Sequence, residues 1–242
     1  MKLLSLICSI ACCSFTFATP LVSKNSAIDT PLVIRQCKDF IVTGKGDNPE
    51  WQKAIWVPLN QIDKTGKQHE TKIKILYSAT GIYVLYSGED EKITSSFQND
   101  FDDLYKGDVF EVFFHPDPSA PVYFEYEVSP LNKELVLLIS NQKGNFGRWM
   151  PWHYEDYKVV KKVNLSGGEM KSGSNIKAWS AEIFFPFSLL NLLEKVPPKS
   201  GMRWNANFCR LDYDSGKMIK WSWSPIKASF HEFQKYYAVQ FE

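Results

Sequence analysis

The chain has 242 residues, of which 44% are hydrophobic and 23% are charged, so it can bury a core and is neither disordered nor fibrous. Its 28 Lys and Arg residues nearly balance its 27 Asp and Glu residues. This balance gives no electrostatic reason to expect nucleic acid or an anionic membrane as a partner. Aromatic residues make up 15% of the chain, a content that favours β-structure or a surface on which ligands stack.

Residues 1–18 have the layout of a secretory signal peptide. Lys2 supplies a positive charge, residues 3–18 carry no charge, and small residues end the segment. The apolar run is shorter than the ~20 residues that a membrane-spanning helix needs. We therefore predict an exported protein, periplasmic, extracellular or on the cell surface, whose mature chain has no integral membrane span. A transmembrane anchor or a buried helix remains the alternative for this segment.

The cysteines bear on export and on cross-linking. Three of them, Cys8, Cys12 and Cys13, lie in the predicted signal peptide, and a lipid anchor at Cys12 or Cys13 is a further alternative. Cys37 and Cys209 remain after cleavage. In an exported protein they form a disulfide or stay as two buried free thiols, and the sequence leaves both open. The chain contains no Cys-x-x-Cys motif or Cys/His cluster that would predict a structural zinc site.

Residues 25–242 predict a single β-rich domain without an interdomain linker. Short runs of β-branched and aromatic residues between turn residues predict strands at 72–77, 82–86, 108–114, 122–128, 133–140, 157–163, 176–185, 203–211, 217–223 and 236–241. The first two should form a hairpin about residues 78–81. Helices are expected only after Pro186 and from Trp51 to Trp56. This pattern predicts an all-β fold, an antiparallel β-sandwich of the jelly-roll or immunoglobulin-like kind, with one or two short helices.

Two segments give more specific expectations. In residues 122–128, apolar and polar side chains alternate, so Tyr123, Glu125 and Glu127 should lie on a solvated face of a half-buried strand. Residues 141–156 are rich in aromatic residues, including Phe146 and Trp149, and we expect an ordered loop packed over a sheet edge or a pocket.

Few residues carry an obvious chemistry. The chain has no hydrolase, metalloprotease or nucleotide-binding motif in the right context. Glu111 interrupts the apolar run 109–114, and a carboxylate in that position must face water, a partner or a ligand. Either Glu111 is a salt-bridged strand residue, or it binds a ligand. Glu125 and Glu127 lie on the next strand, so a pair of catalytic carboxylates is also conceivable.

The aromatic residues suggest a class of ligand. Sugar rings present apolar C–H faces ringed by hydroxyl groups, so a sugar site combines flat aromatic rings with polar groups at their edges. Tyr105 and Phe230 adjoin turn-like sequence, where exposure and burial are equally compatible with the pattern. Trp204 and Trp221 lie in predicted strands and are expected in the core.

Five segments, in order, resemble family 9 carbohydrate-binding modules. Residues 47–54 resemble the opening motif with Asp, Trp and Ala, and residues 71–84 resemble the hairpin motif. Residues 105–113 (Tyr-Lys-Gly-Asp-Val-Phe-Glu-Val-Phe) resemble the family signature W-x-x-D-x-V/F-E-hydrophobic-F. Residues 204–208 and 221–225 resemble the last two core strands. The resemblance covers nearly the whole mature chain and implies a β-sandwich that grips sugar chain ends between two aromatic rings.

The resemblance also implies site residues. Glu111 matches the family's mid-strand carboxylate, and Asn207 falls on a strand position where the family can have glutamine. Tyr105 and Phe230 stand where the family modules have tryptophan, and Glu127 stands where an arginine would fall. The pair Phe230-His231 resembles a Phe-His pair in related stand-alone proteins. The predicted carbohydrate-binding residues are therefore Tyr105, Glu111, Glu127, Asn207, Phe230 and His231.

Three functions follow as hypotheses. The first is a secreted, non-catalytic protein that captures poly- or oligosaccharide in support of carbohydrate catabolism; no catalytic residue is assigned. The second is a glycoside hydrolase that uses carboxylates around Glu111, since modules of this family often accompany hydrolases. The third is a haem-binding sandwich of the DOMON type, which would need a His and a Met facing one pocket. No cofactor is assigned, although family modules can bind structural calcium.

Overall fold

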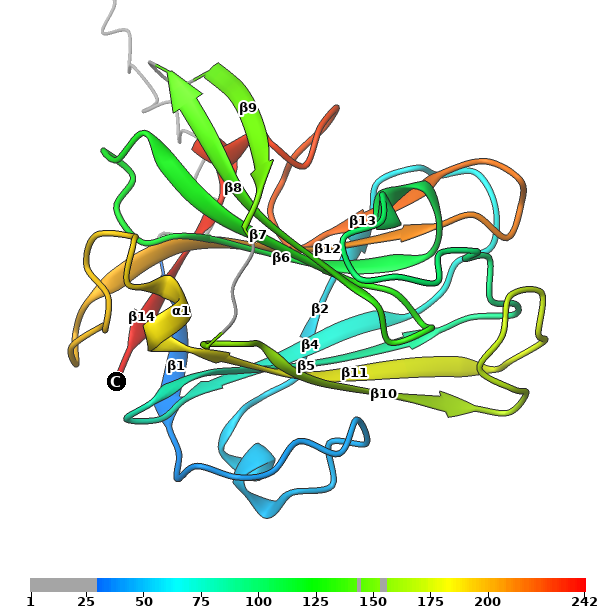
Figure 1. The fold of residues 1–242 in the computed structure, drawn as a ribbon, viewed down its shortest axis with the longest axis horizontal. Coiled ribbons are helices and arrows are strands. Elements are labelled where there is room, and N and C mark those ends of the chain that lie inside the picture. The colour runs from blue at the N-terminus through cyan, green and yellow to red at the C-terminus, as the bar shows by residue number, and fades with distance from the viewer. Residues whose placement is uncertain (1–29, 143–144, 153–155) are drawn as a thin grey trace, which may run out of the picture.

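The computed structural model describes residues 30–142, 145–152 and 156–242. In this part of the chain, fourteen strands form one hydrogen-bonded set that folds into two facing layers. Strand β1 (Leu32–Gln36) joins the layers, because it pairs with β14 (Tyr237–Phe241) of one and with β4 (Thr71–Tyr77) of the other. Figure 1 shows both layers and the side on which β1 and β14 lie. The predicted signal peptide 1–18, with Cys12 and Cys13, falls outside the described residues.

The first layer holds the surface that becomes the candidate site. Its order is β14-β12-β6-β7-β8-β9, and β13 and β3 continue it beside β12. These strands are β3 (Asn60–Gln61), β6 (Val109–His115), β7 (Val122–Val128), β8 (Glu134–Gln142), β9 (Asn145–Pro151), β12 (Arg203–Asp212) and β13 (Ile219–Ser222).

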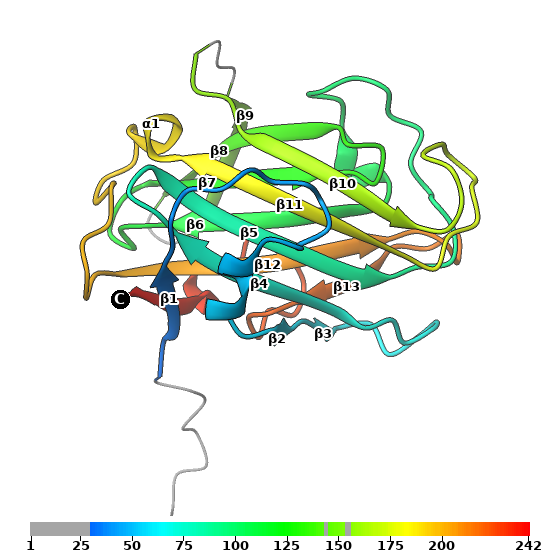
Figure 2. The ribbon, with the colours of Figure 1, turned by 90° about the horizontal axis from the view of Figure 1, so that it is seen from below.

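The second layer has the order β10-β11-β5-β4, with β2 beside β4. Its other strands are β2 (Val57–Pro58), β5 (Gly81–Glu89), β10 (Val160–Ser166) and β11 (Ala178–Pro186). Figure 2, seen from below, shows these strands crossing in front of β12 and β6. The helical elements are α1 (Phe187–Leu190), η1 (Pro49–Lys53), η2 (Leu104–Lys106) and η3 (Phe233–Lys235).

The predicted sandwich is confirmed, with four strands beyond those predicted: β1, β2, β3 and β9. All ten predicted strands are present, and the hairpin β4–β5 turns at Ser78, whose backbone N–H donates to the carbonyl of Gly81 at 2.8 Å. The predicted antiparallel pairing holds between the neighbouring predicted strands. Among the additional strands, β1 pairs in parallel with both β14 and β4 and so closes one side of the sandwich.

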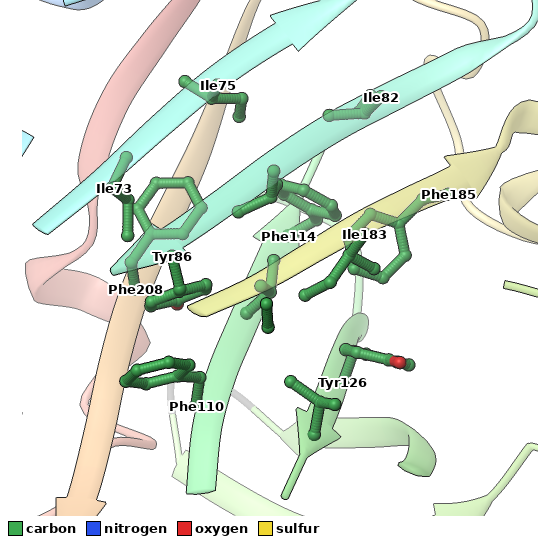
Figure 3. Packing of buried hydrophobic residues seen from close by; sticks show 14 of the residues in the cluster. Ile73, Ile75, Ile82, Tyr86, Phe110, Phe114, Tyr126, Ile183, Phe185 and Phe208 are labelled. Carbon is green, nitrogen blue, oxygen red and sulfur yellow. The ribbon is translucent and has the colours of Figure 1, made fainter. Parts of the chain in front are cut away.

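The core between the layers is aromatic and aliphatic. Alternate residues of β6, Phe110, Val112 and Phe114, point into it and are fully buried. Figure 3 shows Phe110 and Phe114 of one layer against Tyr86 and Ile183 of the other. Trp204 and Trp221 are also buried, as predicted.

The outer face of the second layer is covered by the segment that carries the opening family motif. Trp51 of η1 is buried there, and its Nε1 donates to Glu182 Oε1 at 2.7 Å. The backbone N–H groups of Thr43 and Gly44 donate to Glu182 Oε2 at 2.7 and 2.8 Å. One carboxylate on β11 therefore fixes the whole segment to the sheet.

The outer face of the first layer departs from expectation. Tyr123, Glu125 and Glu127 share one face of β7, as predicted, but all three are buried rather than solvated. The segment 223–236 crosses this face and forms a second apolar cluster on it, which includes Ile226, Phe230 and Phe233. Both faces of β7 are therefore buried. The alternating pattern marks two different buried surfaces, and neither face is exposed to solvent.

Residues 145–151 form strand β9 and are not the ordered loop that the sequence predicts. β9 pairs antiparallel with β8 and extends the first layer at its edge. His153 and Tyr154, which belong to the predicted loop 141–156, lie outside the described residues. The expectation that this segment covers a pocket is met by Phe146 and Trp149, as the site shows.

The sequence leaves open whether the two remaining cysteines form a disulfide or stay as free thiols. In the structure Cys37 and Cys209 are both free and buried. Cys37 belongs to the cluster outside the second layer, whereas Cys209 belongs to the cluster outside the first. Both sheets separate the two thiols, so the free-thiol alternative holds. Among the described residues, no helix is long and apolar enough to cross a membrane.

Candidate functional site

Three glutamates lie side by side on the outer face of the first layer. Glu111 on β6 is directly opposite Glu127 on β7, and it is opposite Cys209 on β12. Side chains of directly opposed residues on one face lie about 5 Å apart at Cβ. Glu125 is two residues from Glu127 on the same face of β7. The strand pairing therefore brings the three carboxyl groups together, as the strand parity predicts.

These glutamates form the floor of a cavity of about 410 Å³. The cavity is lined by Tyr105, Glu111, Glu125, Glu127, Leu135, Leu137, Phe146, Trp149, Leu211, Met218, Lys220, Ala228, Ser229, Phe230 and His231. Five of the six predicted site residues are in this set. The structure thus brings Tyr105, Glu111, Glu127, Phe230 and His231 around one space.

Asn207, the sixth predicted site residue, lies outside the cavity. Its side chain is completely buried. Its Oδ1 accepts from the backbone N–H groups of Phe208 and Ser224, at 3.0 and 2.9 Å, and from Ser222 Oγ at 3.0 Å. The amide therefore holds the chain after β13 against β12, and its position gives it no contact with a ligand in the cavity.

Tyr105 enters the cavity from η2. The Tyr213 hydroxyl donates to the backbone carbonyl of Tyr105 at 2.8 Å. Tyr105 is 36% exposed. Its backbone is therefore fixed while its ring remains available for contact.

Phe230 and His231 enter from the opposite segment, 223–236. Glu232 holds this turn, because its Oε1 accepts from the backbone N–H groups of Lys227, Ala228 and Ser229. Lys235 and these N–H groups lower the pKa of Glu232 to about 2. Phe230 is 8% exposed, so its ring is more deeply seated than that of Tyr105.

His231 is held by three neighbours. Its Nδ1 is 2.9 Å from the hydroxyl of Tyr123, its ring lies 4.4 Å from the ring of Phe146, and Nδ1 is 3.9 Å from Glu125 Oε2. Burial lowers the pKa of His231 to about 4. The imidazole is therefore neutral at pH 7 and adds no positive charge to the cavity.

Two exposed aromatic residues on β9 were not predicted as site residues. Phe146 is 43% exposed and Trp149 is 47% exposed, and both line the cavity. Together with Tyr105 and Phe230 they give the cavity four aromatic rings. The signal for them in the sequence was the aromatic content of residues 141–156, but only the β8–β9 pairing places them above the glutamates.

The three carboxyl groups of the floor are buried and have few hydrogen-bond partners. Burial raises the pKa of Glu125 to about 8, and burial together with the neighbouring carboxyls raises the pKa values of Glu111 and Glu127 well above 4.5. Oε2 of Glu125 and Oε2 of Glu127 are buried without a hydrogen bond. Among the described residues, no lysine or arginine forms an ion pair with any of these three glutamates.

One acidic cluster is a candidate for calcium binding. Asp90, Asp212 and Asp214 bring carboxylate oxygens within 4.8 Å of one another. However, Nη2 of the buried Arg210 donates to Asp90 at 3.2 Å and to Asp212 at 2.6 Å. A guanidinium group therefore already provides the positive charge of this cluster, and the cluster does not fit a calcium ion.

Haem is the other candidate ligand. Met218 and His231 both line the cavity, which is the pairing that a DOMON-type site requires. The imidazole of His231 is already packed among its neighbours, because its Nδ1 lies 2.9 Å from the hydroxyl of Tyr123 and its ring lies 4.4 Å from the ring of Phe146. The residues around this histidine therefore do not fit an axial ligand of haem.

Comparisons with known proteins agree with the resemblance to family 9 modules that the sequence predicts. Residues 42–144 match the family model described as carbohydrate family 9 binding domain-like. This match includes Tyr105, Glu111 and Glu127, whereas Phe230 and His231 lie beyond it. No curated protein is similar enough in sequence to count as a match.

Solved structures share the fold. A proposed carbohydrate-binding protein from Bacteroides uniformis ATCC 8492 aligns over 88% of this chain and 99% of its own, with 16% identity and a TM-score of 0.73. A family 9 carbohydrate-binding module from Caldicellulosiruptor kristjanssonii in complex with cellotriose covers 88% of this chain and 94% of its own, with 13% identity and a TM-score of 0.64. The module from that organism in complex with glucose covers 87% and 95%, with 14% identity and a TM-score of 0.61. The predicted resemblance to family 9 modules is thereby confirmed.

Proposed function

Since residues 42–144 match the family 9 carbohydrate-binding model and the fold is that of such modules, we propose that this protein is a non-catalytic saccharide-binding protein. The observation that carries the proposal is the cavity of about 410 Å³, with aromatic walls and a carboxyl floor. Its volume lies within the usual range of small-ligand sites, roughly 300–1,000 Å³.

The chemistry of the cavity suits a sugar. Tyr105, Phe146, Trp149 and Phe230 offer flat rings to the C–H faces of a pyranose. The carboxyl groups at the floor have raised pKa values, and a protonated carboxyl group offers a sugar hydroxyl both a donor and an acceptor. Solved family 9 modules bound to cellotriose and to glucose support this class of ligand.

We further propose that the protein is exported and captures poly- or oligosaccharide in support of carbohydrate catabolism. The layout of residues 1–18 as a signal peptide supports export. Secretion would be tested by expressing the full chain and sequencing the N-terminus of the exported form. Recovery of the uncleaved chain in the cytoplasm would contradict it.

Calorimetric titration of the folded protein with glucose, cellotriose and a panel of plant, algal and bacterial glycans tests binding. Trp149→Ala should weaken affinity by about tenfold, because a stacking ring is lost, and it should cost little stability because the side chain is 47% exposed. Trp56→Ala is the matched control, since Trp56 is 40% exposed and does not line the cavity. Failure of the folded protein to bind any of these glycans would refute the proposal.

A glycoside hydrolase remains the second candidate, because Glu111, Glu125 and Glu127 share one cavity. A glycosidase needs one protonated and one ionised carboxyl. Here burial raises the pKa of all three glutamates, which favours an acid but not an ionised nucleophile or base. Release of reducing sugar from a bound oligosaccharide, abolished by Glu111→Gln, would establish hydrolysis and displace the binding proposal.

A further inference from the structure

Two carboxyl oxygens at the floor of the cavity have no hydrogen-bond donor. Glu125 and Glu127 each leave one oxygen buried without a hydrogen bond. Their side chains are at least nine-tenths buried, at 4% and 1% exposure, and both line the cavity. A buried acceptor without a donor is costly, so the site is incomplete until a ligand supplies hydrogen-bond donors.

The groups that face this floor cannot neutralise it. His231 makes its Nδ1 contact with Tyr123 and is neutral at pH 7. Lys220, the lysine among the lining residues, reaches the backbone carbonyl of Ala228 at 3.5 Å and forms no ion pair with the glutamates. Tyr105 contributes a hydroxyl and a ring. In the part of the chain that the structure describes, none of the three carboxyl groups is therefore paired with a lysine or an arginine.

The chemistry of the three carboxyl groups indicates which kind of ligand group would bind them. A sugar hydroxyl donates one hydrogen bond, brings lone pairs that need donors in return, and supplies no positive charge that would favour the ionised form of the carboxyl groups. A protonated primary amine has three donors, no acceptor and a positive charge. Aromatic rings around the site add to its attraction, because their faces bind cations. Tyr105, Phe146, Trp149 and Phe230 line the same cavity.

We propose that the saccharide bound here carries a free, protonated amino group, which sits on the Glu111, Glu125 and Glu127 carboxyl groups while the sugar ring stacks on the aromatic walls. This inference rests on the saccharide-binding function proposed above and names its ligand class: an amino sugar whose amine is not acetylated.

A series of β-1,4-linked disaccharides that differ only at C2 tests the inference. The probes are the disaccharide of glucosamine, its N-acetylated form, and cellobiose, titrated calorimetrically at pH 6.5. We expect the amine form to bind at least about tenfold more tightly than the other two, as one charge-assisted hydrogen bond allows. Glu127→Gln should remove that preference, whereas Glu169→Gln, at an exposed glutamate that pairs with Lys171, should keep it.

A second readout is proton release. The carboxyl groups have raised pKa values in the free protein, so an incoming ammonium group should ionise at least one of them and release its proton. Titration in two buffers of different ionisation enthalpy detects this release, and cellobiose should cause none. The isosteric Glu→Gln variants keep the shape of the floor, and circular dichroism confirms that they fold.

The outcomes separate this inference from the function on which it rests. Equal affinity for all three disaccharides, without proton release, would overturn the amino-sugar inference and leave saccharide binding intact. Failure of all three probes and of the wider glycan panel would overturn both. Equal binding of n-propylammonium ion, which has no sugar ring, would also overturn the inference, because the ring would then contribute nothing.

Discussion

Replacing Glu125 by glutamine should stabilise the protein at neutral pH and leave it unchanged in acid. Burial raises the pKa of Glu125 from 4.5 to about 8. Below pH 4.5 the carboxyl is protonated in both the folded and the unfolded chain, so it costs nothing. Above that pH the unfolded chain ionises first and binds fewer protons than the folded chain, so the free energy of unfolding falls as pH rises toward 8.

The magnitude follows from the same numbers. Each pH unit between the two pKa values costs about 1.4 kcal/mol, so at pH 7 the cost in the wild-type protein is about 3 kcal/mol. Glutamine resembles the protonated carboxyl and removes this term, so Glu125→Gln should gain up to about 3 kcal/mol at pH 7 and close to nothing at pH 4.5. For a domain of this size, about 3 kcal/mol corresponds to a rise in Tm of roughly 6–12 °C.

Urea unfolding of both proteins at pH 4.5, 6, 7 and 8 measures the difference. Glu169→Gln, at an exposed position, should leave the pH dependence of unfolding unchanged. A stability difference that is the same at all four pH values, or a variant less stable than the wild type at pH 7, would refute the argument. Either result would mean that ionisation of Glu125 is not what lowers the free energy of unfolding at neutral pH.

Two further variants probe the supports of the fold and the site. Glu232→Ala should weaken saccharide binding and speed hydrogen exchange at the amides of residues 227–229, because those amides lose their acceptor. Its stability cost should exist above pH 4.5 and vanish as pH falls toward 2, since the pKa of Glu232 is lowered in the folded protein. Arg210→Met should lower the free energy of unfolding by about 3–5 kcal/mol, because two buried aspartates lose their cation. The loss should be smaller at pH 5 than at pH 8, and an equal loss at both would count against unpaired charge as its cause.

The strands could be predicted from the sequence because their signals are local. Residues 122–128 alternate with period two, and residues 71–84 place a turn between two apolar runs, so β7, β4 and β5 were predicted within a few residues. The segment 32–36 gave no such signal. β1 exists because β14 and β4 both offer it a free edge, and that opportunity arises only after residues far apart in sequence have met.

The floor of the site was predictable and its walls were not. A glutamate within the apolar run 109–114 must face water, a partner or a ligand, so the sequence alone identifies Glu111 as a candidate site residue. In the sequence, Phe146 and Trp149 resemble core or loop residues. They line the cavity only because β9 pairs with β8. Their role depends on a tertiary arrangement that no local pattern encodes.

Asn207 shows why strand parity alone does not locate a site. It shares a face of β12 with Cys209, which lies directly opposite Glu111, so its alternation pattern is that of a site residue. What decides its environment is the end of β13 and the segment that follows it, because Ser222 and Ser224 donate hydrogen bonds to the Asn207 amide oxygen and cover it. The same segment continues to Phe230 and His231, which reach the cavity. The asparagine therefore helps to hold the segment that forms one wall of the cavity. Its amide contacts that segment and does not reach the cavity itself.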